Sequence, residues 1–154
     1  MAGRPGSAAV AISSNASQFG VDYSDPVVVA LLDQDEGKAR ELFGDQDSGT
    51  GYRLSKHALA RAVRRRATDW GKAGVRLNVV IPGQTDTPLY RAVCADPEMG
   101  QFVDQLPLPL GRTASAEEIA GIIVYMLSEA TSYMHGSVVW ADGGMDAAIR
   151  PDEF

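Results

Sequence analysis

The chain has 154 residues, of which 45% are hydrophobic and 22% are charged, so it fits one globular domain and not a disordered protein. No run of about 18 apolar residues occurs, so no membrane-spanning helix is expected. The formal net charge of −6 argues against nucleic-acid binding by the whole chain. Arg61, Arg64, Arg65 and Arg66 are a local exception, which we interpret as a solvated helix surface.

The chain contains one cysteine, Cys94, and two histidines, His57 and His135. A single cysteine excludes an internal disulfide and fits a reducing compartment, so we expect a cytoplasmic protein. We interpret Cys94 as a structural or incidental thiol. Neither histidine lies in a cluster of ligand-type residues, and no metal site is predicted.

The first half of the chain predicts one strand and two helical pieces. Residues 7–14 are small and β-capable and end in serines, which predicts a buried strand whose carboxyl end opens into a loop. Asp25 followed by Pro26 predicts a helix start, and residues 33–44 predict a second helical piece. Residues 45–51 are rich in Gly, Asp and Ser and predict a loop.

The second half predicts a long helix, a strand and a long loop. Residues 52–71 have helical periodicity, and residues 74–83 form a hydrophobic strand closed by Pro and Gly. Residues 84–112 contain several prolines and are only weakly periodic, which is typical of a functional lid. The apolar face of the predicted helix consists of Leu54, Ala58, Leu59, Ala62 and Val63.

The last part of the chain predicts another helix and strand. Ser115 and Glu118 form a capping-box pattern before an apolar helix, and residues 136–144 predict a strand that ends at two glycines. Strands that alternate with helices predict an α/β fold with right-handed crossovers and a parallel sheet.

Polar and turn residues follow the predicted strands. In parallel sheets of this kind the ligand site lies beyond the carboxyl ends of the strands. Ser13, Ser14, Pro82 and Gly83 all fall at such ends. We therefore expect these four residues at the ligand-binding edge of the sheet.

Tyr52 and Lys56 stand four residues apart on the predicted long helix. A free tyrosine has a pKa near 10, and an ammonium group one helical turn away favours the phenolate, so such a pair can transfer a proton at neutral pH. A nearby hydroxyl, for which Ser14 is the candidate, could hold a substrate carbonyl oxygen. The same spacing also arises by chance on a solvated helix face.

Four stretches of the sequence carry a family resemblance. "AVAISSNAS", "YRLSK", "RLNVVIPGQTDTP" and "VVWADGG" occur in this order and together resemble the C-terminal half of the short-chain dehydrogenase/reductase family. The family's Y-x-x-x-K motif matches Tyr52 and Lys56, and its I-S-S run matches Ser14, preceded by Ser13. The family's P-G-x-x-x-T run and its terminal D-G-G match Pro82, Gly83, Thr85, Thr87, Asp142, Gly143 and Gly144.

The resemblance implies a role for each matched residue. Ser14 would orient and polarise the substrate carbonyl, Tyr52 would be the general acid/base, and Lys56 would assist Tyr52 and bind the nicotinamide ribose. The cofactor would be NAD(H) or NADP(H). The implied cofactor-binding residues are Ser13, Tyr52, Lys56, Pro82, Gly83, Thr85 and Thr87.

The resemblance also implies a fold. It is the C-terminal half of a Rossmann-like doubly wound parallel sheet, with a helical insertion over residues 22–48 between the serine strand and the tyrosine helix. Such an insertion resembles the bacterial 3α-hydroxysteroid dehydrogenase/carbonyl reductase branch. The glycines at 3–6 and 49–51 do not join a strand to a helix. We therefore expect residues 1–154 to be a partial domain without the family's dinucleotide-binding half.

Two functions remain open from the sequence. The first is an oxidoreductase that interconverts a secondary alcohol and a ketone, either a 3-hydroxysteroid and its ketone or another carbonyl compound. The second is a non-catalytic subunit that dimerises with itself or with a full-length paralogue, and in either case a homo-oligomer, such as a dimer, is expected. Apolar lid residues that suit a bulky substrate, and equally suit a core, are Leu89, Tyr90, Val93, Phe102, Val103, Leu106 and Leu108.

Overall fold

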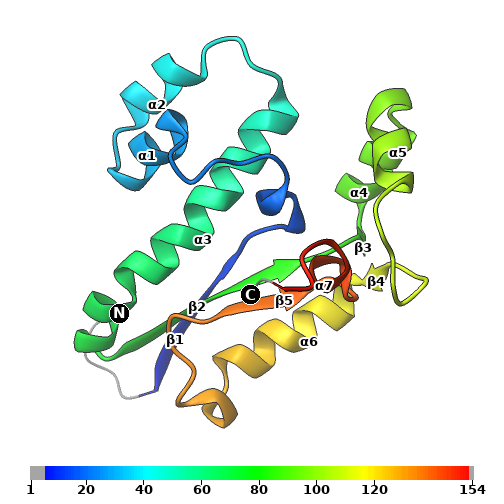
Figure 1. The fold of residues 1–154 in the computed structure, drawn as a ribbon. Helices are drawn as coiled ribbons and strands as arrows, with labels where there is room; N and C mark the ends of the chain where they lie inside the picture. The colour runs from blue at the N-terminus through cyan, green and yellow to red at the C-terminus, as the bar shows by residue number, and fades with distance from the viewer. Residues whose placement is uncertain (1–5, 153–154) are drawn as a thin grey trace.

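A three-stranded parallel sheet forms the centre of the molecule (Figure 1). The computed structural model describes residues 6–152, so most of the 3–6 glycine stretch lies outside the described residues. The sheet consists of β1 (Ser7–Ile12), β2 (Val75–Pro82) and β5 (Val138–Ala141), in the order β1-β2-β5. All pairs are parallel, which confirms the predicted α/β class.

The two neighbours of β2 differ from it in burial. Val79 and Val80 of β2 are fully buried because β2 has a strand on each side and a helix over each face. The residues of β1 are only half-buried or exposed. The prediction of a buried first strand was therefore wrong: within the described sheet β1 is an edge strand, with a neighbouring strand on one side only.

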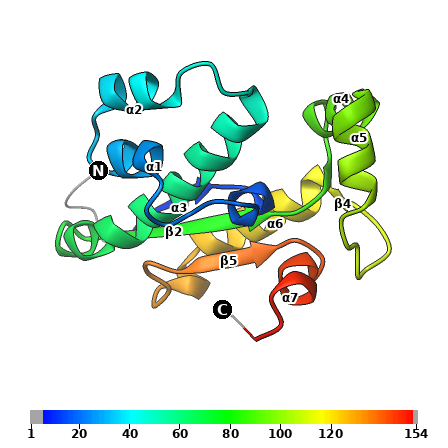
Figure 2. The ribbon, with the colours of Figure 1, turned by 45° about the horizontal axis from the view of Figure 1, so that its top comes forward.

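Two helices cover opposite faces of the sheet. Because side chains alternate along a strand, Leu77 and Val79 face α3 (Ser48–Lys72) and pack with its Val63. Arg76 points to the other face, where its guanidinium binds the last carbonyl oxygens of α6 (Ala116–Leu127). Figures 1 and 2 show α3 and α6 on the two sides of the sheet.

Helix α3 begins earlier than the sequence predicts. Residues 48–51, which lie in a predicted loop, form its first turn, because the Asp47 side chain accepts hydrogen bonds from the backbone and hydroxyl of Thr50. Gly51 packs closely in this turn, since a Cβ there would lie 3.0 Å from the ring of Phe43. Of the predicted apolar face, three residues are buried: Leu54, Ala58 and Val63.

The predicted helical pieces of the first half are present as α1 (Pro26–Leu32) and α2 (Glu36–Phe43). Asp25 starts α1 by accepting from two backbone N–H groups, as the Asp-Pro pair predicts. The two helices lie over the first half of α3 (Figure 1). Their contact with α3 forms a separate core cluster of Val27, Val28, Ala30, Ala39, Leu54 and Ala58.

The weakly periodic segment 84–112 is not one loop. It contains β3 (Thr85–Asp86), α4 (Pro88–Ala95) and α5 (Pro97–Asp104), and β3 pairs with β4 (Ala114–Ser115). Each helix has a capping residue directly before a proline: Thr87 for α4 and Asp96 for α5. The lid prediction missed both helices, because each is only eight residues long and its periodicity is short.

The end of the chain follows the prediction closely. The capping box forms as expected: the Ser115 hydroxyl accepts from the Glu118 N–H, and the Glu118 carboxylate accepts from the Ser115 N–H. The short helices η2 (Glu129–Thr131) and α7 (Met145–Ile149) flank β5. Among residues 6–152 no helix is long and apolar enough to cross a membrane.

Candidate active site

The carboxyl ends of the parallel strands lie at one edge of the sheet, as predicted. Ser13 directly follows β1, and its N–H donates to the Val80 carbonyl oxygen at 2.9 Å. At the end of β2, the Gly83 N–H donates to the Ala141 carbonyl oxygen at 3.0 Å. These backbone hydrogen bonds therefore fix the positions of Ser13, at the start of the serine turn, and of Gly83, in the Pro-Gly turn, relative to the sheet.

Tyr52 and Lys56 lie in the first half of α3, next to the end of β1. The Lys56 Nζ lies 5.6 Å from the centre of the Tyr52 ring and donates to the Ile12 carbonyl oxygen at 2.9 Å. The Ser13 hydroxyl donates to the Lys56 carbonyl oxygen at 2.8 Å. The structure thus brings Tyr52, Lys56 and Ser13 together with the last residue of the serine strand.

Ser14 begins the single-turn helix η1 (Asn15–Gln18). Its hydroxyl accepts from the Ala16 N–H at 3.2 Å and donates to Asn15 Oδ1 at 3.4 Å. No hydrogen bond joins Ser14 to Tyr52 within residues 6–152. The Tyr52 side chain is 41% exposed, so a substrate carbonyl can reach it from solvent.

The segment after β2 is held by contacts of its own. The Thr85 hydroxyl donates to the Gly83 carbonyl oxygen at 3.0 Å, and the Thr87 hydroxyl accepts from the Tyr90 N–H at 3.2 Å. A Cβ on Gly83 would lie 2.6 Å from the Asp142 Cα, so glycine lets this turn pass the end of β5. Within the described residues, no hydrogen bond connects Thr85 or Thr87 to the Tyr52 helix.

The D-G-G residues have a structural role at the end of β5. Asp142 is buried, and its carboxylate accepts from the Gly144 N–H at 3.0 Å and from the Asp146 N–H at 2.7 Å. Gly143 and Gly144 both have positive φ angles, which glycine adopts without strain. This turn starts α7 and places Met145 beside Asn15, whose amide lies 3.0 Å from the Met145 sulfur.

Tyr90, in α4, differs from Tyr52 in its surroundings. Burial, reinforced by a hydrogen bond with Cys94, raises the pKa of Tyr90 to about 12. A phenol with so high a pKa stays protonated at neutral pH and is unsuited to act as a general base. Tyr52, which is exposed and has the Lys56 ammonium beside its ring, is the candidate that the geometry supports.

Sequence reasoning missed residues that connect α3 to the Ser14 turn. His57 Nδ1 lies 2.9 Å from the Ser17 carbonyl oxygen, and the Arg53 guanidinium lies 3.4 Å from the Phe19 carbonyl oxygen. Both side chains lie within one turn of Lys56 on the same helix. Their position next to the Y-x-x-x-K motif was the only available signal, and their partners could not be known without the fold.

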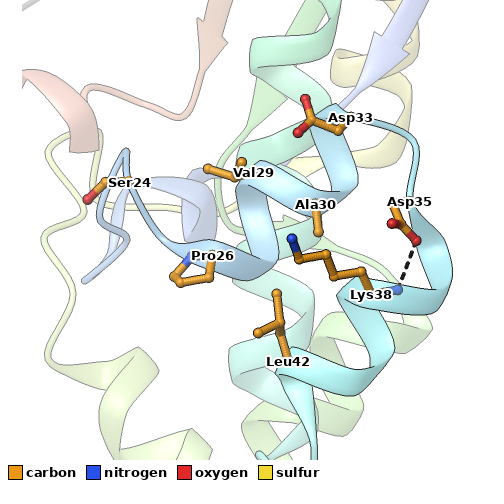
Figure 3. Close-up of a pocket in the computed structure, with 8 residues that line it drawn as sticks. All are labelled: Ser24, Pro26, Val29, Ala30, Asp33, Asp35, Lys38 and Leu42. Atoms are coloured by element: carbon orange, nitrogen blue, oxygen red, sulfur yellow. Dashed lines mark hydrogen bonds between the residues drawn. The ribbon is translucent and has the colours of Figure 1, made fainter.

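Two surface cavities lie away from Tyr52. One, of about 330 Å³, lies between α1 and α2, where the stem of Lys38 runs beside Leu42 and the Asp35 carboxylate binds the Lys38 N–H (Figure 3). The other, of about 400 Å³, lies between the start of α6 and the end of β5. Its lining includes Gln84, Leu110, Arg112, Ile119, Trp140 and Asp142.

Comparisons with known proteins indicate the family of this chain. A family model described as enoyl-(acyl carrier protein) reductase matches residues 41–146. The 3-alpha-hydroxysteroid dehydrogenase/carbonyl reductase of Comamonas testosteroni is 44% identical over 150 residues, which are 96% of this chain and 58% of that protein. The short-chain dehydrogenase srdC of Neurospora crassa is 39% identical over 100 residues, which are 64% of this chain and 36% of that protein.

Solved structures show the same fold. The 3-alpha-hydroxysteroid dehydrogenase from Pseudomonas sp. B-0831, complexed with NADH, matches with a TM-score of 0.91 and 40% identity over 96% of this chain and 58% of that one. A putative NAD(P) dependent gluconate 5-dehydrogenase from Beutenbergia cavernae, with bound NADP, matches with a TM-score of 0.64 and 30% identity over 92% of this chain and 47% of that one.

The parallel sheet with a helix on each face defines a Rossmann-like α/β protein. The chain belongs to the short-chain dehydrogenase/reductase family. It spans less than two thirds of the length of these relatives.

Proposed function

We propose that the protein interconverts a secondary alcohol and a ketone by hydride transfer with NAD(H) or NADP(H). The substrate would be a 3-hydroxysteroid and its ketone, or another carbonyl compound. The main support is the position of Tyr52 and Lys56 on one helix, α3. The Lys56 ammonium there binds the last residue of the serine strand. The names of the Comamonas testosteroni and Pseudomonas relatives support the substrate class.

Tyr52 would transfer the proton in this reaction. Its hydroxyl makes no hydrogen bond within residues 6–152, and its side chain is exposed, so the hydroxyl is free to meet a substrate oxygen. The Ser14 hydroxyl would hold and polarise that oxygen, which requires a small rotation away from Asn15. Lys56 would favour the charged form of Tyr52 in the step where the proton leaves.

The residues at this edge fit a nicotinamide nucleotide, which supplies the hydride when bound. Ribose hydroxyls need donors and acceptors, and the Lys56 ammonium, with three protons, makes one hydrogen bond among the described residues, to Ile12. Ser13 would contribute by holding Lys56, because its buried hydroxyl binds the Lys56 carbonyl. The other residues proposed to line the nicotinamide are Pro82, Gly83, Thr85 and Thr87.

Helices α4 and α5 would cover the substrate. Leu89 and Phe102 are large apolar residues that remain exposed on this segment. The Phe102 ring makes an edge-to-face contact with Phe19, with 6.0 Å between ring centres, so α5 reaches the loop after η1. Apolar side chains in this place support a bulky apolar substrate over a small polar one.

A second proposal is that the chain acts as a non-catalytic subunit of a dimer. It is favoured by the outer side of α6, where Val124 is 67% exposed and Tyr125 is 56% exposed. Exposed apolar side chains that lie together are typical of protein interfaces. We also propose that residues 1–154 are a partial domain with a helical insertion at 22–48, and that the protein is cytoplasmic.

Turnover by the tyrosine variant separates the two functions. The purified chain is assayed for NADH- and NADPH-dependent reduction of a 3-ketosteroid and of simple ketones, next to Tyr52→Phe and the fully exposed Tyr133→Phe. We expect Tyr52→Phe to lose about 10²- to 10⁴-fold in kcat while Tyr133→Phe is unchanged. Equal rates for wild type and Tyr52→Phe would contradict the proposal.

A fusion tests the partial-domain proposal. The chain is joined to the part of the Comamonas testosteroni enzyme that lies outside the match. Turnover by the fusion that Tyr52→Phe abolishes, together with no turnover by the chain alone, supports a catalytic part. If neither protein turns over any of the ketones, the subunit proposal is favoured, and sedimentation of the chain then shows whether it dimerises.

A further inference from the structure

The segment that carries Ser14 is held in place by side-chain hydrogen bonds with the neighbouring helix α3. Residues 13–19, which follow β1, include only one short helical turn, so few of their backbone groups are bound by regular structure. At the start of the segment, the Lys56 ammonium binds the Ile12 carbonyl oxygen at 2.9 Å, and the Ser13 hydroxyl binds the Lys56 carbonyl oxygen. These two bonds fix the chain just before Ser14.

Two further side chains of α3 bind the segment after Ser14. His57 Nδ1 lies 2.9 Å from the Ser17 carbonyl oxygen, whereas the Arg53 guanidinium lies 3.4 Å from the Phe19 carbonyl oxygen and 2.8 Å from Thr50 Oγ1. The histidine bond is the shorter one to the segment. A carbonyl oxygen only accepts hydrogen bonds, so Nδ1 of His57 carries the proton.

The imidazole of His57 has one further contact, with an aromatic ring, while its Nε2 is buried without a hydrogen-bond partner among residues 6–152. The Tyr23 ring packs edge-to-face against it, with 5.1 Å between ring centres, and the Arg61 guanidinium holds Tyr23 through its carbonyl oxygen at 2.6 Å. The amide of Gln18 offers no alternative anchor: both of its polar atoms are buried without a hydrogen-bond partner in residues 6–152. Within residues 14–18, the described side-chain hydrogen bond to α3 is therefore the one from His57.

Holding Ser17 also holds Ser14, because they belong to one turn. The Ser17 N–H donates to the Ser14 carbonyl oxygen at 3.0 Å, and the Ala16 N–H donates to the Ser14 hydroxyl at 3.2 Å. His57 lies on the same helix as Tyr52. A rigid connection from Tyr52 to Ser14 thus runs through His57.

We propose that His57 is a positioning residue that sets the place of the Ser14 hydroxyl relative to Tyr52. The inference rests on the proposed function for its kinetic consequence, and on the hydrogen bond to Ser17 for its structural content. His57 itself contacts backbone and the Tyr23 ring, so its effect on the reaction passes through Ser14.

Two substitutions at His57 test the bond itself. His57→Leu removes the donor, whereas His57→Asn retains an N–H group close to the place of Nδ1. We expect kcat to fall about 10- to 100-fold in His57→Leu, because a misplaced hydroxyl polarises the substrate oxygen less well. The KM for the nicotinamide nucleotide stays unchanged, and His57→Asn restores most of kcat.

Amide hydrogen exchange measures the attachment without turnover. The N–H groups of Ala16 and Ser17 both bind Ser14, so they report directly on the turn. Losing the bond from His57 should speed their exchange about 3- to 10-fold in His57→Leu, with slow exchange regained in His57→Asn.

The second histidine provides a matched control. His135 also connects α3 to a neighbouring element: its Nε2 lies 2.6 Å from the Ala67 carbonyl oxygen, and its Nδ1 accepts from the Leu77 N–H at 2.9 Å. This contact is at the opposite end of α3 from Ser14. His135→Leu should lower thermal stability and leave both kcat and the exchange of Ala16 and Ser17 unchanged.

Each outcome decides between the possibilities. Unchanged exchange in His57→Leu overturns the proposal, whatever the turnover. Faster exchange with wild-type kcat overturns the positioning role. A fall in kcat that His57→Asn does not restore also counts against it. If neither the wild-type chain nor its fusion turns over a ketone, the proposed function is wrong, and the exchange of Ala16 and Ser17 alone decides whether His57 holds the turn.

Discussion

Helix α3 binds its surroundings differently at its two ends. In its first half, Lys56 and His57 extend to backbone carbonyl oxygens of the segment that carries Ser14. Near its last turn, the helix instead offers a carbonyl oxygen, that of Ala67, to His135, whose other ring nitrogen holds the strand β2 through Leu77.

The two ends of α3 hold different kinds of structure. The first half orders an irregular turn beside an exposed tyrosine, whereas the last turn connects two regular elements that already pack through Val63 and Val79. Contacts of the first kind place reactive groups and contribute little to a core. We therefore expect substitutions near Ser14 to change turnover more than stability, and substitutions at the far end of α3 to do the reverse.

The largest expected effect is that of Ser14→Ala at the near end. Loss of a hydroxyl that polarises the substrate oxygen should lower kcat about 10²- to 10³-fold. The free energy of unfolding should fall by only about 0.5–1 kcal/mol, because a single cap on Ala16 is lost. Steady-state kinetics and thermal denaturation measure the two quantities.

The matched control for Ser14→Ala is Ser55→Ala. Ser55 lies on α3, is exposed, and its hydroxyl binds the Tyr52 carbonyl oxygen of its own helix. We expect kcat within a factor of about two of wild type, since the hydroxyl does not leave the helix backbone. If Ser14→Ala lowers kcat no more than Ser55→Ala does, the proposed difference between the two ends of α3 is wrong.

The next largest effect is that of Arg76→Met at the far end. The guanidinium donates to the Met126, Ser128 and Met134 carbonyl oxygens and so holds the end of α6 and the turn after it against β2. Hydrogen bonds from a charged donor contribute more than neutral ones, so unfolding should become easier by about 3 kcal/mol. Chemical denaturation measures this change.

Turnover measurements show whether Arg76, like the other residues at the far end of α3, affects stability and not the reaction. At temperatures below the transition, Arg76→Met should turn over at the wild-type rate. The control is Arg66→Met, in the exposed arginine group on α3, which should shift the free energy of unfolding by less than about 0.5 kcal/mol. If Arg76→Met leaves the stability unchanged but lowers turnover, the proposed separation between residues that affect turnover and residues that affect stability is wrong.

Much of the fold could be predicted because its signals are local. The Asp25–Pro26 start of α1 and the Ser115–Glu118 capping box are read within four residues. The start of α3 was missed because Gly49 and Gly51 are typical of loops, and the close packing of Gly51 against the Phe43 ring is visible only in the fold. Local patterns cannot report a contact of that kind.

The same reasoning applies to the candidate site. The four-residue spacing of Tyr52 and Lys56 predicts their shared helix, and the strand before Ser14 predicts its place at the sheet edge. The bonds from Lys56 to Ile12 and from His57 to Ser17 join residues 40 or more positions apart. They have no periodicity in the sequence, so they emerge only when α3 packs beside β1.

A smaller effect at the far end concerns a single turn. Gly136 has a φ of +68°, and a Cβ there would lie 3.0 Å from the Ala67 Cβ, so Gly136→Ala should destabilise the protein by about 1–2 kcal/mol. Gly121 lies in α6, where a Cβ would meet no atom within 4 Å, so Gly121→Ala should stabilise by up to about 1 kcal/mol. Thermal denaturation with opposite signs for these two changes is the expected result; equal signs would mean that the tight contact near Ala67 is not a constraint.

The smallest effect concerns the start of α6, whose end Arg76 holds. Hydrogen bonds from the Arg112 guanidinium, and then from the Ser115 N–H, lower the pKa of Glu118 from its usual 4.5 to about 2. A carboxyl group whose pKa is lower in the folded state stabilises fully above pH 4.5 and loses this contribution as the pH falls towards 2. The difference in melting temperature between wild type and Glu118→Gln should therefore be constant from pH 7 to about 5 and disappear near pH 2.

Arg76 provides the contrast in the same titration. Its partners are carbonyl oxygens and the Thr131 hydroxyl, which do not titrate in this range. The decrease in melting temperature caused by Arg76→Met should therefore stay about the same between roughly pH 7 and pH 3. The two ends of α6 would then separate cleanly: a pH-dependent contribution at Glu118 and a pH-independent one at Arg76. A Glu118→Gln difference that persists near pH 2 would show that the carboxylate charge is not what stabilises the helix start.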